Sequence, residues 1–507
     1  MKATILALLI TLWVVPLLTW AQSTLPTESA TRSEATLPAK MDLTTSIDLS
    51  KYNLNIVWTL GCGCLVLLMQ FGFALVETGL IRAKNSAHTF AMVFMTLPLG
   101  ALAFWVYGFA LGWGNLAHAP TSVGWESTLG PGLNLLSTGL APGGWGLMGG
   151  KGFFLAGSDQ ASVLALFFYM LMLFNLAATI PTGALAERWG WGNFCIYVLW
   201  VALPFGLYAH WVWGGGWLAQ LGVKAGLGHG AVDFAGSGVV HCLGGVIALA
   251  GAQAIGPRIG KFFQGRAQAI PGHDLPMVMG GTLVLSFGWL GLTAGSTLSC
   301  ADLRISVIVV NTLLAAAAGA VASMLVMWWK FGKPDPSLMC NGLLAGLVAI
   351  TASCAFVGPT AAVFIGAVAG VLVVFSVFYW DRIGVDDPIG AISMHGVNGA
   401  WGLLAVGLFA NGRYGKNLNG VEGTVRGLFY GDVKQLLAQL ISLVTLLVFG
   451  YVMAWVWFRF SNRIFPLRAS REAEYQGLDI PEMGALGYSD FMLKASHSVS
   501  EIPMAQQ

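Results

Sequence analysis

Long apolar runs recur along most of the chain, separated by short polar or glycine-rich segments. After one run at the extreme N-terminus, eleven more follow, at residues 54–81, 88–113, 161–186, 191–212, 233–256, 275–297, 303–329, 337–357, 359–381, 389–411 and 431–459. A helix needs about 20 apolar residues to cross a bilayer, and in lipid it satisfies its own backbone hydrogen bonds. The pattern predicts an all-α polytopic membrane protein with eleven transmembrane helices.

The first apolar run has the features of a signal peptide. Lys2 precedes the run, which ends in Thr19-Trp20-Ala21. The small residues Thr19 and Ala21, at positions −3 and −1, fit cleavage after Ala21. We therefore expect a signal peptide at residues 1–21 and a polar, exported, poorly ordered tail at residues 22–52. An uncleaved first helix is the alternative interpretation.

The eleven spans place the two ends of the mature chain on opposite sides of the membrane. We expect a multi-pass protein of the inner cell membrane, with the mature N-terminus outside and the tail at 461–507 in the cytoplasm. Loops predicted to be inside carry more Lys and Arg than loops predicted to be outside, as the positive-inside rule requires. The long outside loop, residues 114–158, is rich in Gly, Pro and Ser, and we interpret it as a lid or an interface element.

The amino-acid composition agrees with a membrane protein and excludes a soluble one. The chain is 56% hydrophobic and 9% charged, whereas soluble domains carry about 25% charged residues. Its 67 glycines suit helices packed backbone to backbone. The net charge of +2 gives no sign of a nucleic-acid partner. The seven cysteines form no CxxC pair or metal-ligand spacing, so we read them as packing residues.

Two histidines lie inside apolar, glycine-rich runs. His241 and His395 each follow an aspartate by eight residues and precede a glycine by four. A polar ring in hydrocarbon is costly and usually serves a function. The repeated pattern suggests two related halves that face a common centre.

A second repeated pattern supports this division. The run Phe71–Gly79 resembles Phe287–Gly295, and the two lie in spans one and six. Since five spans per copy is an odd number, the second copy must be inverted in the membrane. We expect repeats at 53–257 and 273–412, with an eleventh helix at 430–460. Inverted repeats are typical of transporters that bind their substrate near the midplane.

Paired histidines near the midplane have several possible functions. They could bind a metal, shuttle protons or line a path for a small polar solute. Each ring could instead only hydrogen-bond a neighbouring helix. No complete metal-ligand set adjoins both rings, although Cys242 follows His241, so a membrane metalloenzyme is the weaker alternative.

Several segments together resemble the ammonium transporters of the Amt/MEP/Rh superfamily. They are distributed along residues 53–491 and occur in the family's order. They are Glu77–Asn85, Gly183–Phe194, His210–His241, Leu275–Ser296, Asp386–Gly399 and Gly477–Phe491. The resemblance implies a homotrimer in the lipid bilayer, with one conduction path for ammonium or ammonia in each protomer. It implies no cofactor and no enzymatic activity.

The resemblance also assigns roles to individual residues. It implies that Trp213 and Ser296 form the external ammonium recruitment site, with Asp233 beside it. It identifies His241 and His395 as the paired histidines of the pore. An indole face attracts a cation by roughly 0.5–2 kcal/mol, and a serine hydroxyl can accept an N–H bond. Below this site, loss of a proton costs less than moving the ion through an apolar wall.

The chain departs from the family pattern at two places. The family stacks two phenylalanines between the recruitment site and the histidines, but both gate positions here are leucine, Leu173 and Leu292. The gate could be rebuilt with transport intact, or the protein could be a non-conducting sensor or a channel for another small neutral molecule. In the tail, Met483 replaces a histidine that is common in the family. The resemblance implies a cytoplasmic PII-type regulatory partner.

Overall fold

A computed structural model describes residues 43–114 and 145–489 of the chain. The predicted signal peptide at 1–21, most of the exported tail at 22–52 and most of the predicted outer loop lie outside the described residues. The chain divides into two units, Met1–Leu49 and Ser50–Gln507, and the description below concerns the second.

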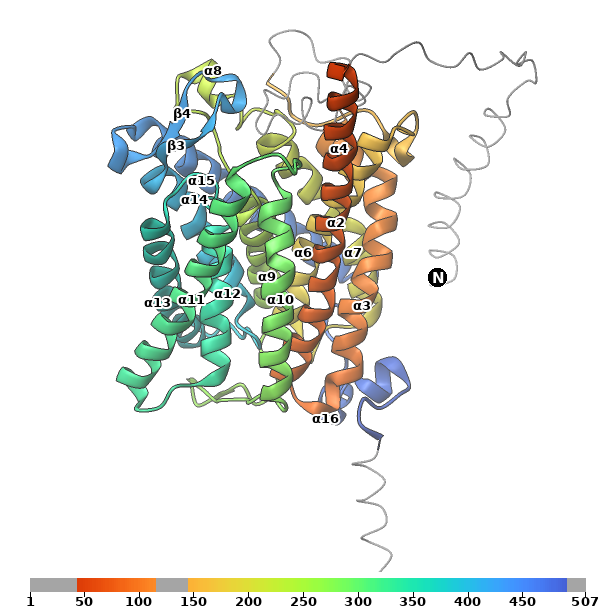
Figure 1. Ribbon diagram of the computed structural model, residues 1–507. Coiled ribbons are helices and arrows are strands. Elements are labelled where there is room, and N and C mark those ends of the chain that lie inside the picture. Colours follow the sequence, from red (N-terminus) through yellow and green to blue (C-terminus); the bar gives the residue numbers. More distant parts are fainter. Residues whose placement is uncertain (1–42, 115–144, 490–507) are drawn as a thin grey trace, which may run out of the picture. The chain divides into compact units, whose positions relative to one another are not determined.

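The described chain is mainly helical, and each of the eleven predicted runs contains a helix (Figure 1). In chain order the helices are α2 (Leu43–Leu80), α3 (Ser86–Ala103), α4 (Phe109–Trp113), α6 (Ala161–Leu185), α7 (Trp191–Val212), α8 (Leu221–Ala225), α9 (Leu243–Ile255), α10 (Leu275–Gly295), α11 (Arg304–Phe331), α12 (Pro336–Ile350), α13 (Pro359–Arg382), α14 (Asn398–Phe409), α15 (Val433–Ser461) and α16 (Arg471–Gln476). A π-helical turn, Phe104–Gly108, joins α3 to α4 in one span. Ten of the described spans are long and apolar enough to cross a membrane. The prediction of an all-α polytopic fold is confirmed.

The eighth predicted span, residues 337–357, differs from the others because its helix is short. α12 has 15 residues and ends at Ile350. Beyond it, the carbonyls of Thr351 and Ala352 accept hydrogen bonds from the backbone of Ala235 and Phe234. Ser237 also accepts a bond from the Ala352 amide. These bonds to the segment before α9 replace the helical bonds that residues 351 and 352 would otherwise make.

Two short hairpins complete the described structure. β1 (Phe262–Phe263) pairs antiparallel with β2 (Arg266–Ala267), with Phe262 opposite Ala267. β3 (Asn411–Lys416) pairs antiparallel with β4 (Thr424–Arg426), with Asn411 opposite Arg426. The first hairpin connects α9 to α10, and the second follows α14.

The repeated run found in the sequence packs against its own second copy. A Cβ at Gly72 of α2 would lie 2.8 Å from Leu285 of α10. Gly288 is the counterpart of Gly72 in the second run, and its contact is the reciprocal one. A Cβ at Gly288 would lie 2.3 Å from the Met69 side chain of α2. The glycines let the two backbones approach closely. The contacts run in opposite directions along the two helices, as an inverted two-fold relation requires.

The two histidine-bearing segments cross in the same reciprocal way. A Cβ at Gly245 would lie 2.2 Å from the amide nitrogen of Gly396. A Cβ at Gly399 would lie 2.7 Å from the amide nitrogen of Cys242. The glycine four residues after each histidine is therefore the point at which the opposite helix passes. This contact confirms that the two halves meet at a common centre.

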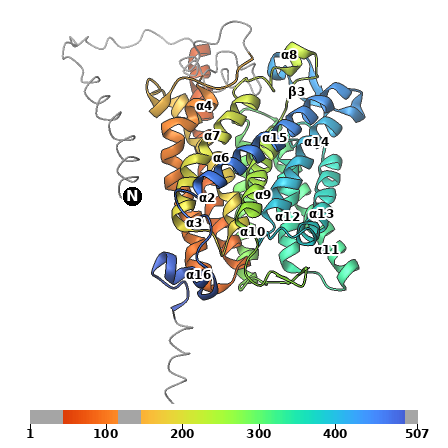
Figure 2. The ribbon, with the colours of Figure 1, turned by 180° about the vertical axis from the view of Figure 1, so that it is seen from behind.

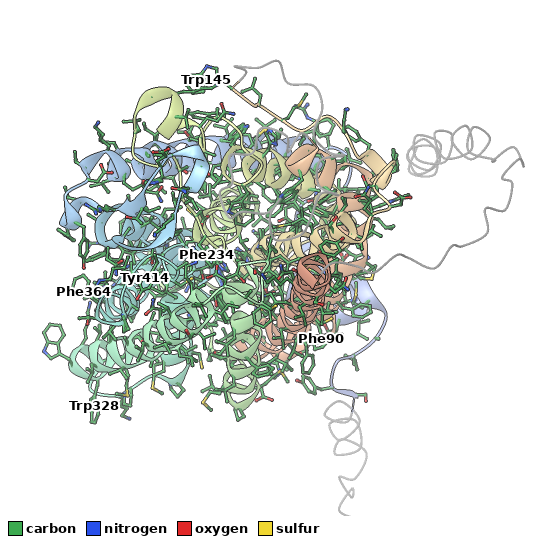
Figure 3. All side chains as sticks on the ribbon, turned by 45° about the horizontal axis from the view of Figure 1, so that its top comes forward. Phe90, Trp145, Phe234, Trp328, Phe364 and Tyr414 are labelled. Carbon is green, nitrogen blue, oxygen red and sulfur yellow. The ribbon has the colours of Figure 1, made fainter. Side chains whose placement is uncertain are left out.

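Helix α15 joins the two repeats. Gly450 of α15 packs against Leu243 of α9, and Leu436 of α15 packs against Gly407 of α14. The three helices lie side by side in Figure 2. The eleventh helix thus contacts one helix from each repeat. Facing away from the bundle, α11 and α13 carry exposed apolar side chains such as Trp328 and Phe364 (Figure 3), which suits contact with lipid.

Charged side chains gather where α2, α6, α9 and α13 end. Arg258 donates to Glu187 (2.8 Å) and to Asp386 (2.9 Å), and all three are buried. Burial raises the pKa of Asp386, but nearby Arg188 and the paired Arg258 outweigh it and hold that pKa below its ordinary value.

The C-terminal tail packs against the same loops, since Lys84 donates to the carbonyls of Glu474 and Tyr475.

Candidate functional site

The structure brings the two predicted pore histidines into direct contact. The Nδ1 atoms of His241 and His395 are 3.2 Å apart, and the ring centroids are 5.2 Å apart with an interplanar angle of 20°. Both residues are buried. A hydrogen bond between two Nδ1 atoms needs a donor and an acceptor, so neutral rings must have opposite tautomers. The free Nε2 of one ring then donates, and that of the other accepts.

The aspartate eight residues before each histidine shapes the backbone. Asp233 accepts hydrogen bonds from the amides of Gly236 (3.0 Å), Gly238 (2.8 Å) and Val239 (2.8 Å). In the second repeat, Asp387 accepts equivalent bonds from residues 391 (2.9 Å) and 392 (2.7 Å). Each carboxylate thus accepts hydrogen bonds from backbone amides at the start of a helical segment, where the helix itself provides no acceptor. This capping accounts for the common spacing.

Both histidines lie in π-helical turns. His241 lies in the turn Ser237–Cys242, which leads into α9, and His395 lies in Ile392–Val397, which leads into α14. π-helical turns are rare and occur often at functional sites. Neither turn is visible in the hydrophobic pattern, because one extra residue per turn barely alters an apolar run.

Each histidine ring also contacts an aromatic ring that sequence reasoning missed. Trp289 of α10 stacks on His241, with centroids 4.8 Å apart and an angle of 14°. Phe73 of α2 lies against His395 at 5.9 Å. Phe73 and Trp289 occupy the same position in the two repeated runs. Aligning those runs would have identified them as a pair facing the two-fold centre.

Trp213 and Asp233 lie together, at the start of the His241 segment. The indole Nε1 donates a 2.6 Å bond to the backbone carbonyl of Asp233. A Cβ at Gly236 would lie 3.3 Å from the Trp213 ring. The carboxylate of Asp233 is occupied by backbone amides, as described above. Asp233 therefore positions the tryptophan and the π-helical turn.

Ser296 belongs to a second cluster, with Tyr169. Its hydroxyl donates to the carbonyl of Leu292 (2.8 Å), and the Tyr169 hydroxyl lies 3.2 Å from the serine oxygen. Tyr169 also donates to the Leu292 carbonyl at 2.7 Å. With both protons directed at this carbonyl, the Ser296 oxygen can accept a bond from a cation. Sequence reasoning missed Tyr169, although it lies one helical turn before Leu173.

Each of the two predicted gate leucines lies one helical turn from the Tyr169–Ser296 cluster, Leu173 on α6 and Leu292 on α10. Trp289 and Leu292 of α10 share one helix face with its C-cap residue, Ser296. The seven-residue step from Trp289 to Ser296 spans about 10 Å. Trp289 stacks on His241, so Leu292 lies between Ser296 and the histidine pair. On α6, Leu173 lies one turn beyond Tyr169. Both leucines are buried, at 1% and 0% exposure.

Phe174, next to the gate position on α6, does not replace a gate phenylalanine. Its ring stacks on Phe104 at 5.2 Å and contacts Phe205 at 5.3 Å. These partners lie in the π-helical turn after α3 and in α7. The ring therefore belongs to an aromatic cluster between these segments, and the two gate positions stay aliphatic.

Within the described residues, no group of three or more His, Cys, Asp or Glu side chains is placed to hold a metal ion. Cys242 adjoins His241 in sequence but packs against Gly399. The arrangement is instead a buried line of aromatic and aliphatic side chains with two adjacent imidazoles. Such a line can pass a small uncharged molecule that forms hydrogen bonds, and it opposes a bare ion.

Comparisons with known proteins found similar sequences along most of the chain. The family model described as the Ammonium Transporter Family matches residues 57–488. The chain is 43% identical to the ammonium transporter Amt2 of Archaeoglobus fulgidus, over 89% of this chain and 91% of that protein. It is 34% identical to an ammonium transporter of Bacillus subtilis, over 85% of this chain and 97% of that protein.

Solved structures of an Amt protein and of Mep2 are similar to this chain. A structure titled "Sensor Amt Protein" is similar with a TM-score of 0.73 and 30% identity, covering 86% of this chain and all of that one. The structure of Mep2 from Candida albicans is similar with a TM-score of 0.70 and 25% identity, covering 85% of this chain and 90% of that one.

Proposed function

The chain belongs to the ammonium transporter family, and from this premise we propose that it carries ammonium across a membrane as ammonia. Transport proceeds by capture of the cation, loss of a proton and passage of the neutral amine past two histidines. The observation that carries this proposal is the His241–His395 contact, formed by opposite repeats in a buried apolar surrounding. Homologues of 43% and 34% identity bear the name ammonium transporter.

Capture takes place at Trp213 and Ser296. The indole face attracts a cation by about 0.5–2 kcal/mol, and the Ser296 oxygen can accept one N–H bond, since its own proton points at Leu292. Asp233 acts indirectly, because it holds Trp213 through a backbone carbonyl. Its negative charge also favours a cation in the outer mouth.

Deprotonation follows from the cost of the apolar path. A bare ion entering a medium of low dielectric would lose tens of kcal/mol of hydration energy. Removing one proton from a simple amine costs about 1.4 kcal/mol for each pH unit below its pKa, a few kcal/mol in all. Potassium has no proton to lose, so the same path excludes it. The paired imidazoles supply the hydrogen bonds that ammonia loses with its water.

The leucine gate fits transport. Leu173 and Leu292 close the path to water without an aromatic ring, and the family motifs on both sides of them are intact. A non-conducting sensor, the alternative that the leucines raised, is not favoured, since the homologues with the higher identities are named transporters. We therefore assign the leucine pair to a desolvating gate.

The decisive experiment compares ammonium and potassium in proteoliposomes. We expect uptake of the added cation after an ammonium jump but not after a potassium jump. His241→Ala and His395→Ala should each lower the rate at least about tenfold, because one Nε2 site and the Nδ1 bond are lost. His229→Ala is the matched control, a buried histidine whose backbone binds Gln435 and Asn419. Wild-type uptake in both pore variants would refute the pore assignment.

We also propose how the protein is placed and assembled. It is a multi-pass membrane protein, and its distribution of positive charge supports an inner-membrane location with the tail in the cytoplasm. A homotrimer is proposed from family membership. The tail segment Ser470–Met483, which packs on the loops near Lys84, is the proposed contact for a PII-type regulator. Co-purification with and without residues 470–507 tests the regulator.

A further inference from the structure

Helix α12 ends inside the bundle, and the residue that follows it contacts a ring of the pore. The last helical residue is Ile350, and Thr351 comes next. Thr351 is buried, and its hydroxyl makes two hydrogen bonds. It donates to the carbonyl of Leu347 in α12 (2.6 Å) and accepts from the indole Nε1 of Trp289 on α10 (2.9 Å). The end of α12 is therefore bonded directly to the ring that stacks on His241.

The break after α12 is stabilised from two sides. Asn311 of α11 donates to the carbonyls of Cys354 (2.9 Å) and Val357 (2.8 Å), which follow the break. From the other side, the amide of Ala235 donates to the Thr351 carbonyl at 3.2 Å. These bonds replace those that a continued helix would make, so the turn has a fixed position. A hydroxyl on such a turn can hold a neighbouring side chain in one orientation.

The two aromatic rings beside the histidines differ in how they are held. Trp289 lies nearly parallel to His241, at 14° and 4.8 Å, whereas its counterpart Phe73 is tilted by 38° and lies 5.9 Å from His395. Phenylalanine has no side-chain donor, but the indole Nε1 is one, and its bond to Thr351 selects one rotation of the ring about χ2. The closer and more parallel contact thus belongs to the ring that a hydrogen bond holds.

The orientation of Trp289 affects both histidines. The buried ring of His241 stacks on the indole, so the plane of the indole constrains the plane of the imidazole. The Nδ1 of His241 lies 3.2 Å from that of His395, and a hydrogen bond at this distance depends on the direction of the N–H group. A change at Thr351 can therefore alter the histidine pair through Trp289.

We propose that Thr351 is a positioning residue of the pore. Its hydroxyl fixes the indole of Trp289 and, through the indole, directs the ring of His241 toward His395. This inference rests on the proposed function. Thr351 serves the passage of ammonia past the histidines and not the capture of the cation at the recruitment site. Loss of the hydroxyl should therefore slow transport and leave the ammonium concentration for half-maximal uptake unchanged.

The experiment measures uptake by proteoliposomes containing the full chain, over a series of ammonium concentrations and per reconstituted protein. Thr351→Val keeps the shape of the side chain and removes the hydroxyl. We expect it to lower the maximal rate about tenfold, the equivalent of one hydrogen bond worth ~1.4 kcal/mol. The concentration for half-maximal uptake should stay within about twofold of wild type. Thr351→Ser keeps the hydroxyl and should restore the maximal rate to within about twofold of wild type.

Thr96→Val is the matched control. Thr96 is also buried and also donates to the carbonyl four residues earlier in its own helix, that of Met92 (2.9 Å). Its replacement removes the same kind of intrahelical bond, and uptake should stay at the wild-type rate.

A double-mutant cycle isolates the bond between Thr351 and Trp289. Trp289→Phe keeps an aromatic ring and removes Nε1. Adding Thr351→Val to Trp289→Phe should therefore change the maximal rate by less than about twofold. If Thr351 stabilised only its own helix, Thr351→Val would produce its full loss in both backgrounds.

The outcomes separate this inference from the proposed function. A wild-type maximal rate in Thr351→Val overturns the inference and leaves ammonium transport standing. A rate in Thr351→Ser as low as in Thr351→Val, or a full loss that persists beside Trp289→Phe, overturns it as well. If Thr351→Val does not fold, as thermal unfolding in detergent would show, Thr351→Ala takes its place. If Trp289→Phe takes up no ammonium, the comparison of Thr351→Val with Thr351→Ser decides. Absence of ammonium uptake by wild-type protein defeats the proposed function itself.

Discussion

Gly245→Ala tests how closely the two repeats must approach for the histidines to meet. The added methyl group would lie 2.2 Å from the amide nitrogen of Gly396, which is 1.2 Å short of the 3.4 Å at which ordinary contact begins. The nearest atoms are backbone, so no side chain can rotate away. The clash can be relieved only if the segments that carry His241 and His395 move apart.

The magnitude follows from the same contact. The histidine Nδ1 atoms are 3.2 Å apart, and a hydrogen bond between them is lost beyond about 3.5 Å. A separation of even one third of the steric shortfall would therefore break it. Overpacking of this kind costs about 1–3 kcal/mol of stability. We expect a lower melting temperature and ammonium uptake reduced at least about tenfold, because loss of the bond disorders both rings.

The assay is ammonium uptake by proteoliposomes, together with thermal unfolding in detergent. Gly280→Ala is the matched control, because a Cβ there meets nothing within 4 Å and alanine stabilises a helix by about 0.5–1 kcal/mol over glycine. Gly399→Ala, the reciprocal change, should behave like Gly245→Ala, with its methyl 2.5 Å from the Ser237 carbonyl. If Gly245→Ala matched the control in both measurements, the reasoning that this approach positions the pore would be refuted.

Two further predictions follow from other parts of the site. Trp213→Leu should raise the ammonium concentration for half-maximal uptake by about twofold to thirtyfold, since a cation–π contact of 0.5–2 kcal/mol is lost; an unchanged value would remove Trp213 from the recruitment site. Asp386→Asn should destabilise the protein by about 3–5 kcal/mol at neutral pH, because it breaks a buried ion pair and leaves Glu187 as the one carboxylate of the described chain bonded to the buried Arg258 guanidinium. The folded pKa of Asp386 is lowered, so its stabilisation is complete above about pH 4 and is lost as the pH falls further. Below that pH, the difference in melting temperature between wild type and Asp386→Asn should become smaller. Asp381→Asn removes one partner of a partly exposed ion pair and should cost less than about 1 kcal/mol of stability at every pH.

The order and length of the apolar runs predicted the architecture of this protein. Apolar runs of bilayer length identified the eleven spans, because lipid leaves the backbone few alternatives. The spacing of Asp233 to His241 and of Asp387 to His395 revealed the two halves, because each aspartate caps the segment that carries its histidine. The prediction of an inverted repeat followed from the two similar runs, Phe71–Gly79 and Phe287–Gly295, and from the odd number of spans per copy.

The tertiary structure decided which side chains meet. Trp289 stacks on His241, Phe73 lies tilted against His395, and Tyr169 contacts Ser296. These contacts join helices that are distant in the chain. Hydrophobic periodicity reports which residues are buried, but in a membrane bundle nearly every position is apolar, so it does not indicate which neighbour each one faces. The two π-helical turns that carry the histidines lie where the repeats pack against each other, and local sequence carries no signal for them.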